Sequence, residues 1–169
     1  MISLAYTSSL DPDFAAIVAP LLAHDDVQSM HSFRHHDRTA LTHSLSVSTL
    51  SFSLARRLGL DSVSVARGAL LHDFFLYDRR ADKTRFHLNR HAKVALRNAS
   101  ARFSLNPVEQ DIILAHMWPV GRPFYTYRES ALVSFVDKFV SAREVTLMVL
   151  RSIKSRYTVL ASRLAADLN

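Results

Sequence analysis

Apolar residues recur at helical spacing along most of the chain. Between Thr39 and Leu58 they form a helical stripe of Leu41, Leu45, Leu50, Leu54, Ala55 and Leu58, and the run ends at Gly59, as is typical of a helix closed by a glycine. Asp11-Pro12 and Asn106-Pro107 each place a capping side chain before a proline, so we expect helices to begin there. The full pattern predicts helices at about 12–24, 39–58, 62–73, 91–103 and 107–117, a further helix from 129 onward, and a final one at about 152–168.

The apolar positions of the last third predict which side chains face the core. From Glu129 onward, those expected to pack inward are Leu132, Val133, Val136, Phe139, Val140, Val145, Leu147 and Met148. A final helix from Ser152 to Leu168 is expected to close the fold. Residues 30–38, 78–90 and 120–128 lack a clear period and are expected to be connectors.

Composition supports one all-α domain, a bundle of about seven helices spanning residues 1–169. The 169 residues include only three glycines and five prolines, too few turn residues for a many-stranded sandwich or barrel. There is no cysteine, which excludes disulfides, thiolate metal sites and cysteine nucleophiles. Any transition metal must therefore be held by nitrogen and oxygen atoms.

Charge and hydropathy limit the kinds of partner that the protein can bind. No apolar run is long enough to span a membrane, and the N-terminus lacks the pattern of a signal peptide, so we expect a cytoplasmic protein without a membrane partner. The net charge is +6, but the basic residues are dispersed, which argues against a nucleic-acid partner. The apolar C-terminal helices leave room for a homodimer.

Five ionisable residues interrupt apolar helical segments, and a sixth, His91, begins its helix. For any one of them, a hydrogen-bonded core histidine or a local cap is the commoner explanation. Six on five successive helices favour a shared metal cluster, which would satisfy all of them at once. The separations from the first histidine to the last aspartate are 29, 19, 25 and 21 residues, each about one helix plus a connector. The six residues are His43, His72, Asp73, His91, His116 and Asp137.

This ordered pattern resembles the HD-domain metal-dependent phosphohydrolases over residues 30–145. His43, His72-Asp73 and Asp137 match the defining H…HD…D of that family, and the FVDK sequence around Asp137 fits as well. His91 and His116 stand where the two-metal sub-group, which includes bacterial HDIG-type hydrolases, has further histidines. Phe74-Phe75-Leu76 replaces the Ile-Gly-Lys of many relatives. The chain also lacks a nearby GYP sequence, which argues against a cyclic-dinucleotide phosphodiesterase.

The resemblance implies two divalent transition metal ions. One would be held by His43, His72, Asp73 and Asp137, and a second by His91 and His116 with Asp73 as the bridge. Nitrogen and carboxylate ligands suit iron, manganese or zinc better than magnesium, and the resemblance favours iron or manganese. The implied reaction is hydrolysis of a phosphate mono- or diester of a nucleotide or related small molecule by a metal-bound hydroxide.

The remaining phosphate charge needs cationic partners. Lys138 directly follows a predicted ligand and is a candidate both for catalysis and for substrate binding. Arg80, Arg122 and Arg128 lie on the flanking connectors and are candidate substrate-binding residues, although a solvated surface charge is the commoner role of each. Asp78 is a candidate proton donor to the leaving oxygen, with a helix cap as the alternative. His87 is a reserve metal ligand in case His91 points away.

Two alternatives use the same residues. A site with one ion would suit a nucleoside-monophosphate phosphatase. A non-catalytic module would instead use the site to sense a metal or a nucleotide, and the missing Gly-Lys after His72-Asp73 favours that hypothesis.

Overall fold

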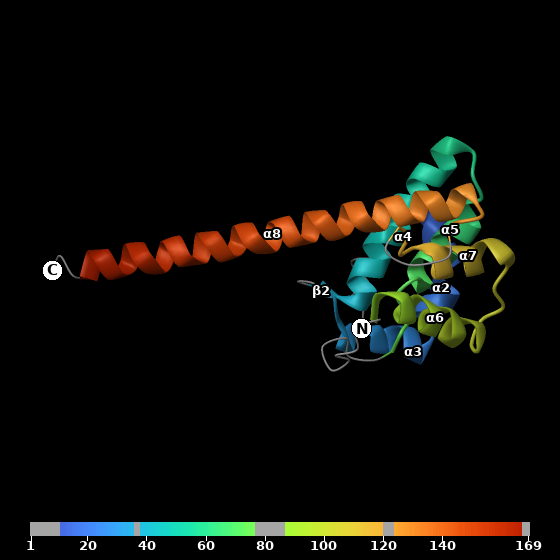
Figure 1. The fold of residues 1–169 in the computed structure, drawn as a ribbon, viewed down its shortest axis with the longest axis horizontal. Helices are drawn as coiled ribbons and strands as arrows, with labels where there is room; N and C mark the ends of the chain where they lie inside the picture. Colours follow the sequence, from blue (N-terminus) through green and yellow to red (C-terminus); the bar gives the residue numbers. More distant parts are fainter. Residues whose placement is uncertain (1–10, 36–37, 77–86, 120–123, 167–169) are drawn as a thin grey trace.

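Helices make up most of the structure. The computed structural model describes residues 11–35, 38–76, 87–119 and 124–166 (Figure 1). Within these ranges the helices are α2 (Pro12–Leu22), α3 (Asp25–Ser29), α4 (Ala40–Leu58), α5 (Ser62–Leu71), α6 (His87–Ser100), α7 (Pro107–Ala115) and α8 (Arg128–Ala166). A single 3-10 turn, η1 (Met30–Ser32), leads into a two-residue hairpin of β1 (Arg34–His35) and β2 (Arg38–Thr39). The predicted all-α class is confirmed, whereas the hairpin and α3 were not predicted.

The predicted helix boundaries are confirmed where they depend on local chemistry. The Asp11 carboxylate accepts the backbone N–H of Asp13 at 2.9 Å, and Asn106 accepts that of Glu109 at 2.8 Å. Asp61 caps α5 by accepting the N–H of Ser64 at 3.0 Å. Gly59 ends α4 with a φ of 64°, a left-handed conformation that glycine adopts without strain.

The bundle is built around α4 and α5. One apolar cluster joins these helices to α2 and α6 through residues such as Phe14, Leu45, Phe52 and Leu70. A second cluster joins them to α7 and α8 through Val47, Val65, Ile112, Val133 and Val136. The two clusters therefore fix six helices around the ends of α5 and α7, where the candidate chemistry lies.

Close packing of α5 on α7 requires a glycine. A Cβ placed on Gly68 would lie 3.0 Å from Cδ1 and 3.1 Å from Cβ of Ile112. Any larger side chain at this position would push the two helices apart.

The C-terminal third differs from the prediction. The two helices expected from 129 onward and at 152–168 are one continuous 39-residue helix, α8. Its first part crosses the bundle and its remainder projects away as a lone helix (Figure 1). Among the α8 side chains that the structure describes, Glu144 is the last buried one.

Some positions expected in the core are exposed. Val133, Val136 and Val140 are buried as predicted, but Phe139 is 55% exposed and Met148 is 39% exposed. Val145 is also on the surface, at 36% exposure. The helical period was recognised correctly, but α8 carries apolar residues on two sides and the bundle covers only one of them.

No helix among the described residues combines the length and the apolar character that crossing a membrane requires.

Candidate metal centre

The structure brings the six predicted side chains together at the centre of the bundle. His43 lies in the first turns of α4, His72 and His116 are the C-caps of α5 and α7, His91 lies in α6 and Asp137 lies in α8. Asp73 follows His72 directly. All six are buried, and the most exposed of them, Asp137, is only 8% exposed. Five helices thus deliver ionisable groups to one interior point, as the sequence spacing predicts.

One group of side chains surrounds His72. Its Nε2 lies 3.7 Å from Oδ2 of Asp73 and 3.7 Å from Oδ1 of Asp137. The Nε2 of His43 donates a hydrogen bond to Oδ1 of Asp137 at 3.0 Å. Ligand atoms of His43, His72 and Asp73 lie close enough together to hold a metal ion, and Asp137 adjoins them.

A second group shares Asp73. The Oδ1 of Asp73 lies 3.5 Å from Nε2 of His91 and 3.7 Å from Nε2 of His116. The two imidazole nitrogens are 3.0 Å apart. These three residues also form a cluster that could hold a metal ion. Asp73 therefore directs one carboxylate oxygen to each group.

Helix ends orient two of the imidazoles. The Nδ1 of His72 donates to the backbone carbonyl of Ala69 at 2.7 Å, and Nδ1 of His116 donates to that of Ile113 at 2.8 Å. Both carbonyls belong to the last turn of a helix and would otherwise lack a partner. These hydrogen bonds fix the tautomer and leave each Nε2 pointing into the cluster.

The donor set fits divalent transition metals. The buried Nε2 of His72 has no hydrogen-bond partner, an arrangement that is costly unless an ion completes it. Imidazole and carboxylate together suit iron, manganese or zinc. Phe75 packs edge-on to His91 with ring centroids 6.1 Å apart and covers this side of the centre.

The charges of the metal-free cluster compensate one another. Burial alone lowers the pKa of His43, but hydrogen bonds to Asp137 and Glu144 outweigh this effect and raise the pKa to about 9. The pKa of His72 is likewise raised, because nearby Asp73 and Asp137 outweigh its burial. For His116, burial and the neighbouring His72 lower the pKa to about 3, so this imidazole is neutral. Burial raises the pKa of Asp137, but His43 and His72 hold it well below its usual value.

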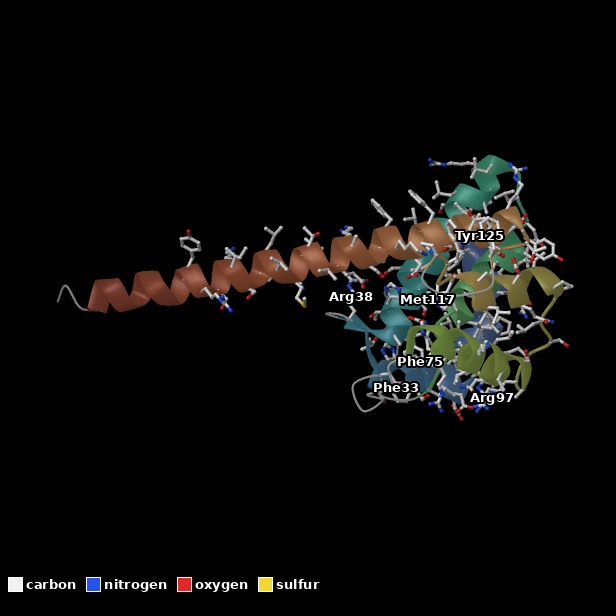
Figure 2. The ribbon with its side chains drawn as sticks, in the orientation of Figure 1. Phe33, Arg38, Phe75, Arg97, Met117 and Tyr125 are labelled. Atoms are coloured by element: carbon white, nitrogen blue, oxygen red, sulfur yellow. The ribbon has the colours of Figure 1, made fainter. Side chains whose placement is uncertain are left out.

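Glu144 is a site residue that the sequence prediction missed. Its Oε2 accepts a hydrogen bond from Nδ1 of His43 at 3.1 Å, and its Oε1 lies 3.6 Å from Nε of Arg38. Figure 2 shows Arg38 below α8, near the point where that helix leaves the bundle. The available signal was spacing, since Glu144 follows Asp137 by seven residues and so shares its helix face.

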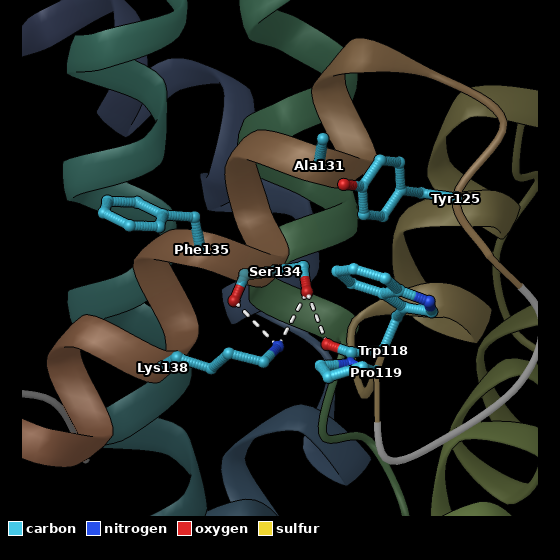
Figure 3. Close-up of a pocket in the computed structure, with 7 residues that line it drawn as sticks. All are labelled: Trp118, Pro119, Tyr125, Ala131, Ser134, Phe135 and Lys138. Atoms are coloured by element: carbon cyan, nitrogen blue, oxygen red, sulfur yellow. Dashed lines mark hydrogen bonds between the residues drawn. The ribbon is translucent and has the colours of Figure 1, made fainter.

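Lys138, the predicted catalytic and phosphate-binding residue, is bonded to oxygens of the protein itself. Its ammonium group donates to the backbone oxygen of His116 at 2.9 Å. It also donates to the backbone oxygen of Ser134 at 3.1 Å and to the Ser134 hydroxyl at 2.7 Å (Figure 3). The Ser134 hydroxyl in turn donates to the His116 carbonyl at 2.8 Å. A lysine has three N–H donors, and all three are engaged. Lys138 therefore ties the end of α7, and with it His116, to α8.

Arg128 lies far from the cluster. It is the first residue of α8 and is exposed. It precedes Asp137 by nine residues, which on a helix is about 13 Å along the axis. The structure therefore does not place Arg128 at the cluster. Asp78, Arg80 and Arg122 lie outside the described residues, and His87 begins α6 with a side chain that is not described.

An aromatic pocket lies behind His116. It is lined by Trp118, Pro119, Tyr125, Ala131, Ser134, Phe135 and Lys138 (Figure 3). Trp118 packs edge-on against Tyr125 with ring centroids 5.3 Å apart. Because Ser134 and Lys138 contact the backbone oxygen of His116, the pocket adjoins the backbone of this residue, whereas its imidazole points into the cluster.

Comparison with known proteins identifies the family. A model of the HD domain matches residues 40–140, which includes all six clustered residues. The chain belongs to the HD-domain family. Members of this family are generally metal-dependent hydrolases, and the histidine and aspartate clusters described above could hold the metal. No curated protein and no solved structure matches the chain.

Proposed function

We propose that this HD-domain protein is a cytoplasmic phosphohydrolase that uses two metal ions. Its substrate would be a phosphate mono- or diester of a nucleotide or of a related phosphorylated small molecule. The observation that carries the proposal is the position of Asp73. One of its carboxylate oxygens lies 3.7 Å from His72, and the other lies 3.5 Å from His91 and 3.7 Å from His116. A carboxylate can bridge two ions, whereas an imidazole nitrogen binds only one.

Each ion would have its own ligands beside the shared carboxylate. His43, His72 and Asp137 would hold the first, and His91 and His116 the second. When bound, two divalent ions lower the pKa of coordinated water and stabilise charge on a phosphoryl group. The absence of thiolate ligands and the mixture of imidazole and carboxylate favour iron or manganese, with zinc as a further possibility.

The protein's own residues would orient and shield this centre. The backbone carbonyls of Ala69 and Ile113 hold the imidazoles of His72 and His116 in one tautomer. Phe74 and Phe75, which are 0% and 1% exposed, exclude water from the interior side. A dry, pre-oriented site strengthens electrostatic interactions with a charged substrate.

Contacts to the substrate would come from the connectors. Arg80 and Arg122 remain our predicted phosphate-binding residues, and Asp78 our predicted proton donor to the leaving oxygen. All three lie on segments that flank the helix ends carrying His72 and His116. Lys138 and Arg128 are not part of this proposal, because the first is engaged by protein oxygens and the second lies far along α8.

Elemental analysis of the anaerobically purified protein tests the proposal, together with activity assays of metal-reloaded protein on a panel of phosphate mono- and diesters. We expect about two ions per chain. We expect His91→Ala and His116→Ala to lose one of them and His24→Ala to keep both, because His24 is the N-cap of α3 and lies outside the cluster.

The other outcomes identify the alternatives. One ion per chain, unchanged in His91→Ala, would favour a mononuclear nucleoside-monophosphate phosphatase. A fully loaded protein that binds nucleotides tightly but cleaves none of the panel would favour a sensor module.

A further inference from the structure

An apolar stripe runs along the side of α8 that faces away from the bundle. Phe135 and Phe139 are 69% and 55% exposed where α8 crosses the bundle. Further along, Leu150 is 55%, Ile153 47% and Tyr157 71% exposed. Exposed apolar residues in a continuous row mark an interaction surface more often than scattered ones do.

The stripe lies opposite the buried face of the same helix. Val133 and Val140, buried against the bundle, each stand two residues before a member of the stripe, Phe135 and Ala142. Two residues on a helix correspond to a rotation of about 200°. The bundle therefore leaves the stripe open along its whole length.

The spacing of the stripe is symmetric about Thr146. Phe135, Phe139 and Ala142 precede Thr146 by 11, 7 and 4 residues, and Leu150, Ile153 and Tyr157 follow it by 4, 7 and 11. An 11-residue repeat corresponds to about 3.67 residues per turn, so the positions stay on one face of a nearly straight helix. A symmetric stripe matches itself when a second copy is turned end for end.

We propose that this protein forms a homodimer in which α8 pairs antiparallel with α8 of a second copy, about a two-fold axis at Thr146. Phe135 of one copy then lies opposite Tyr157 of the other, Phe139 opposite Ile153, and Ala142 opposite Leu150. Such a contact is closed and isologous, since each surface meets its own equivalent. The two bundles sit at opposite ends, each on the outer side of its own helix.

The size of the contact supports a second copy of the chain as the partner of α8. The stripe extends over about 33 Å, from 22 residues at about 1.5 Å each. Two helices paired over this length bury on the order of 1,000 Å² or more, which is within reach of a stable interface. The projecting part of α8 contains many β-branched residues, and a helix of this composition is marginal in water without tertiary packing.

Charge predicts how the dimer responds to salt. The described side chains of α8 beyond Glu144 include Arg151, Lys154 and Arg156 and no acidic residue. In the antiparallel pair Ala142 of one copy faces Leu150 of the other, and each is followed by an arginine, Arg143 or Arg151. These like charges lie near each other, so added salt should strengthen the dimer by screening them. An anionic membrane or a nucleic acid would be attracted by the same charges, and salt would weaken its binding.

A matched pair of variants of the full chain tests the interface. Ile153→Asp places a carboxylate in the stripe, whereas Ser155→Asp adds the same charge on the opposite side of α8. By sedimentation velocity over a range of concentrations, we expect the wild type and Ser155→Asp to be dimers that tighten with salt. We expect Ile153→Asp to raise the dissociation constant roughly 100-fold or more, because a buried unpaired charge is costly.

Single cysteines test the antiparallel register, because the natural chain has no cysteine. Thr146→Cys lies on the proposed two-fold axis and should form a disulfide with its own copy on mild oxidation. Ile153→Cys alone should not, since its opposite residue is Phe139. A mixture of Ile153→Cys and Phe139→Cys chains should cross-link into a heterodimer.

Other results would overturn the proposal. A wild-type protein that stays monomeric at every concentration and salt level would exclude the dimer. Efficient cross-linking of Ile153→Cys to itself would indicate a parallel pair. A monomer that binds anionic lipid vesicles, and that Ile153→Asp releases, would assign the stripe to a membrane surface.

Discussion

Glu144 accepts a hydrogen bond from His43 across the bundle, at 3.1 Å between Oε2 and Nδ1. The two residues lie 101 positions apart in the chain. His43 presents its other nitrogen to Asp137 and to the cluster, so Glu144 determines which way this imidazole faces. A carboxylate behind a metal-binding histidine fixes its tautomer and increases its basicity.

Replacing Glu144 with glutamine should weaken metal binding without unfolding the protein. The amide keeps the size of the side chain but removes the negative charge behind His43. We expect metal affinity to fall about 10- to 100-fold, measured by competition with a coloured chelator. Glu129→Gln, at the start of the same helix, serves as the control and should keep wild-type affinity. Equal affinities for all three proteins would show that Glu144 is only a packing residue.

The pH dependence of the metal-free protein follows from His43. Burial lowers its pKa, but Asp137 and Glu144 outweigh this and raise it to about 9, above the usual 6.5. The folded state therefore binds this proton more tightly than the unfolded state. The resulting stabilisation is complete below about pH 6.5 and is lost as the pH rises through about 9. We expect the Tm of chelator-treated protein to fall over this range.

Added metal should reverse the fall in Tm that is expected as the pH rises. Ions bind the deprotonated imidazole, so metal affinity should increase over the same pH range and binding at neutral pH should release protons. Differential scanning fluorimetry with chelator and with added metal measures both profiles. His43→Gln is the control and should flatten the metal-free profile. A metal-free Tm that rises between about pH 6.5 and 9 would contradict the charge assignment of His43.

Gly68→Val should loosen the packing of α5 on α7. The added side chain meets Ile112, whose Cδ1 already lies 3.0 Å from the position of a Cβ. We expect a loss of about 1–3 kcal/mol in the free energy of unfolding, measured by urea denaturation. Metal affinity should fall as well, because α5 and α7 end at His72 and His116. Ala16→Val, at an exposed position of α2, should cost no more than about 0.7 kcal/mol. If the free energy of unfolding of Gly68→Val equals that of the wild type, α5 and α7 can move apart without a loss of stability.

Lys138→Met should distinguish a structural role from a substrate contact. The change removes three hydrogen bonds to oxygens of His116 and Ser134. We expect a loss of about 1–3 kcal/mol in the free energy of unfolding and little change in KM for an active phosphate ester. Lys154→Met, on the projecting part of α8, should leave both unchanged. A large increase in KM at wild-type stability would restore the phosphate-binding role predicted from the sequence.

The helix ends show what can be predicted locally. Asp11 and Asn106 cap helices where the sequence predicts, because a capping side chain acts within three residues of its own position. The break expected near Ser152 is absent from the structure. From residue 124 onward the chain contains neither glycine nor proline, so nothing in its covalent structure interrupts α8.

The sequence by itself determined most of the helices, their order and the six ionisable residues that meet inside the bundle. Those residues were recognisable because charged groups in apolar helical segments need partners, and such groups can be identified directly from the sequence. Only the tertiary structure decided that Glu144 joins the site, that Lys138 bonds to α7 and that Phe139 faces solvent. These three lie on one helix with similar local sequence, and their roles differ because neighbouring helices cover one side of α8 and not the other.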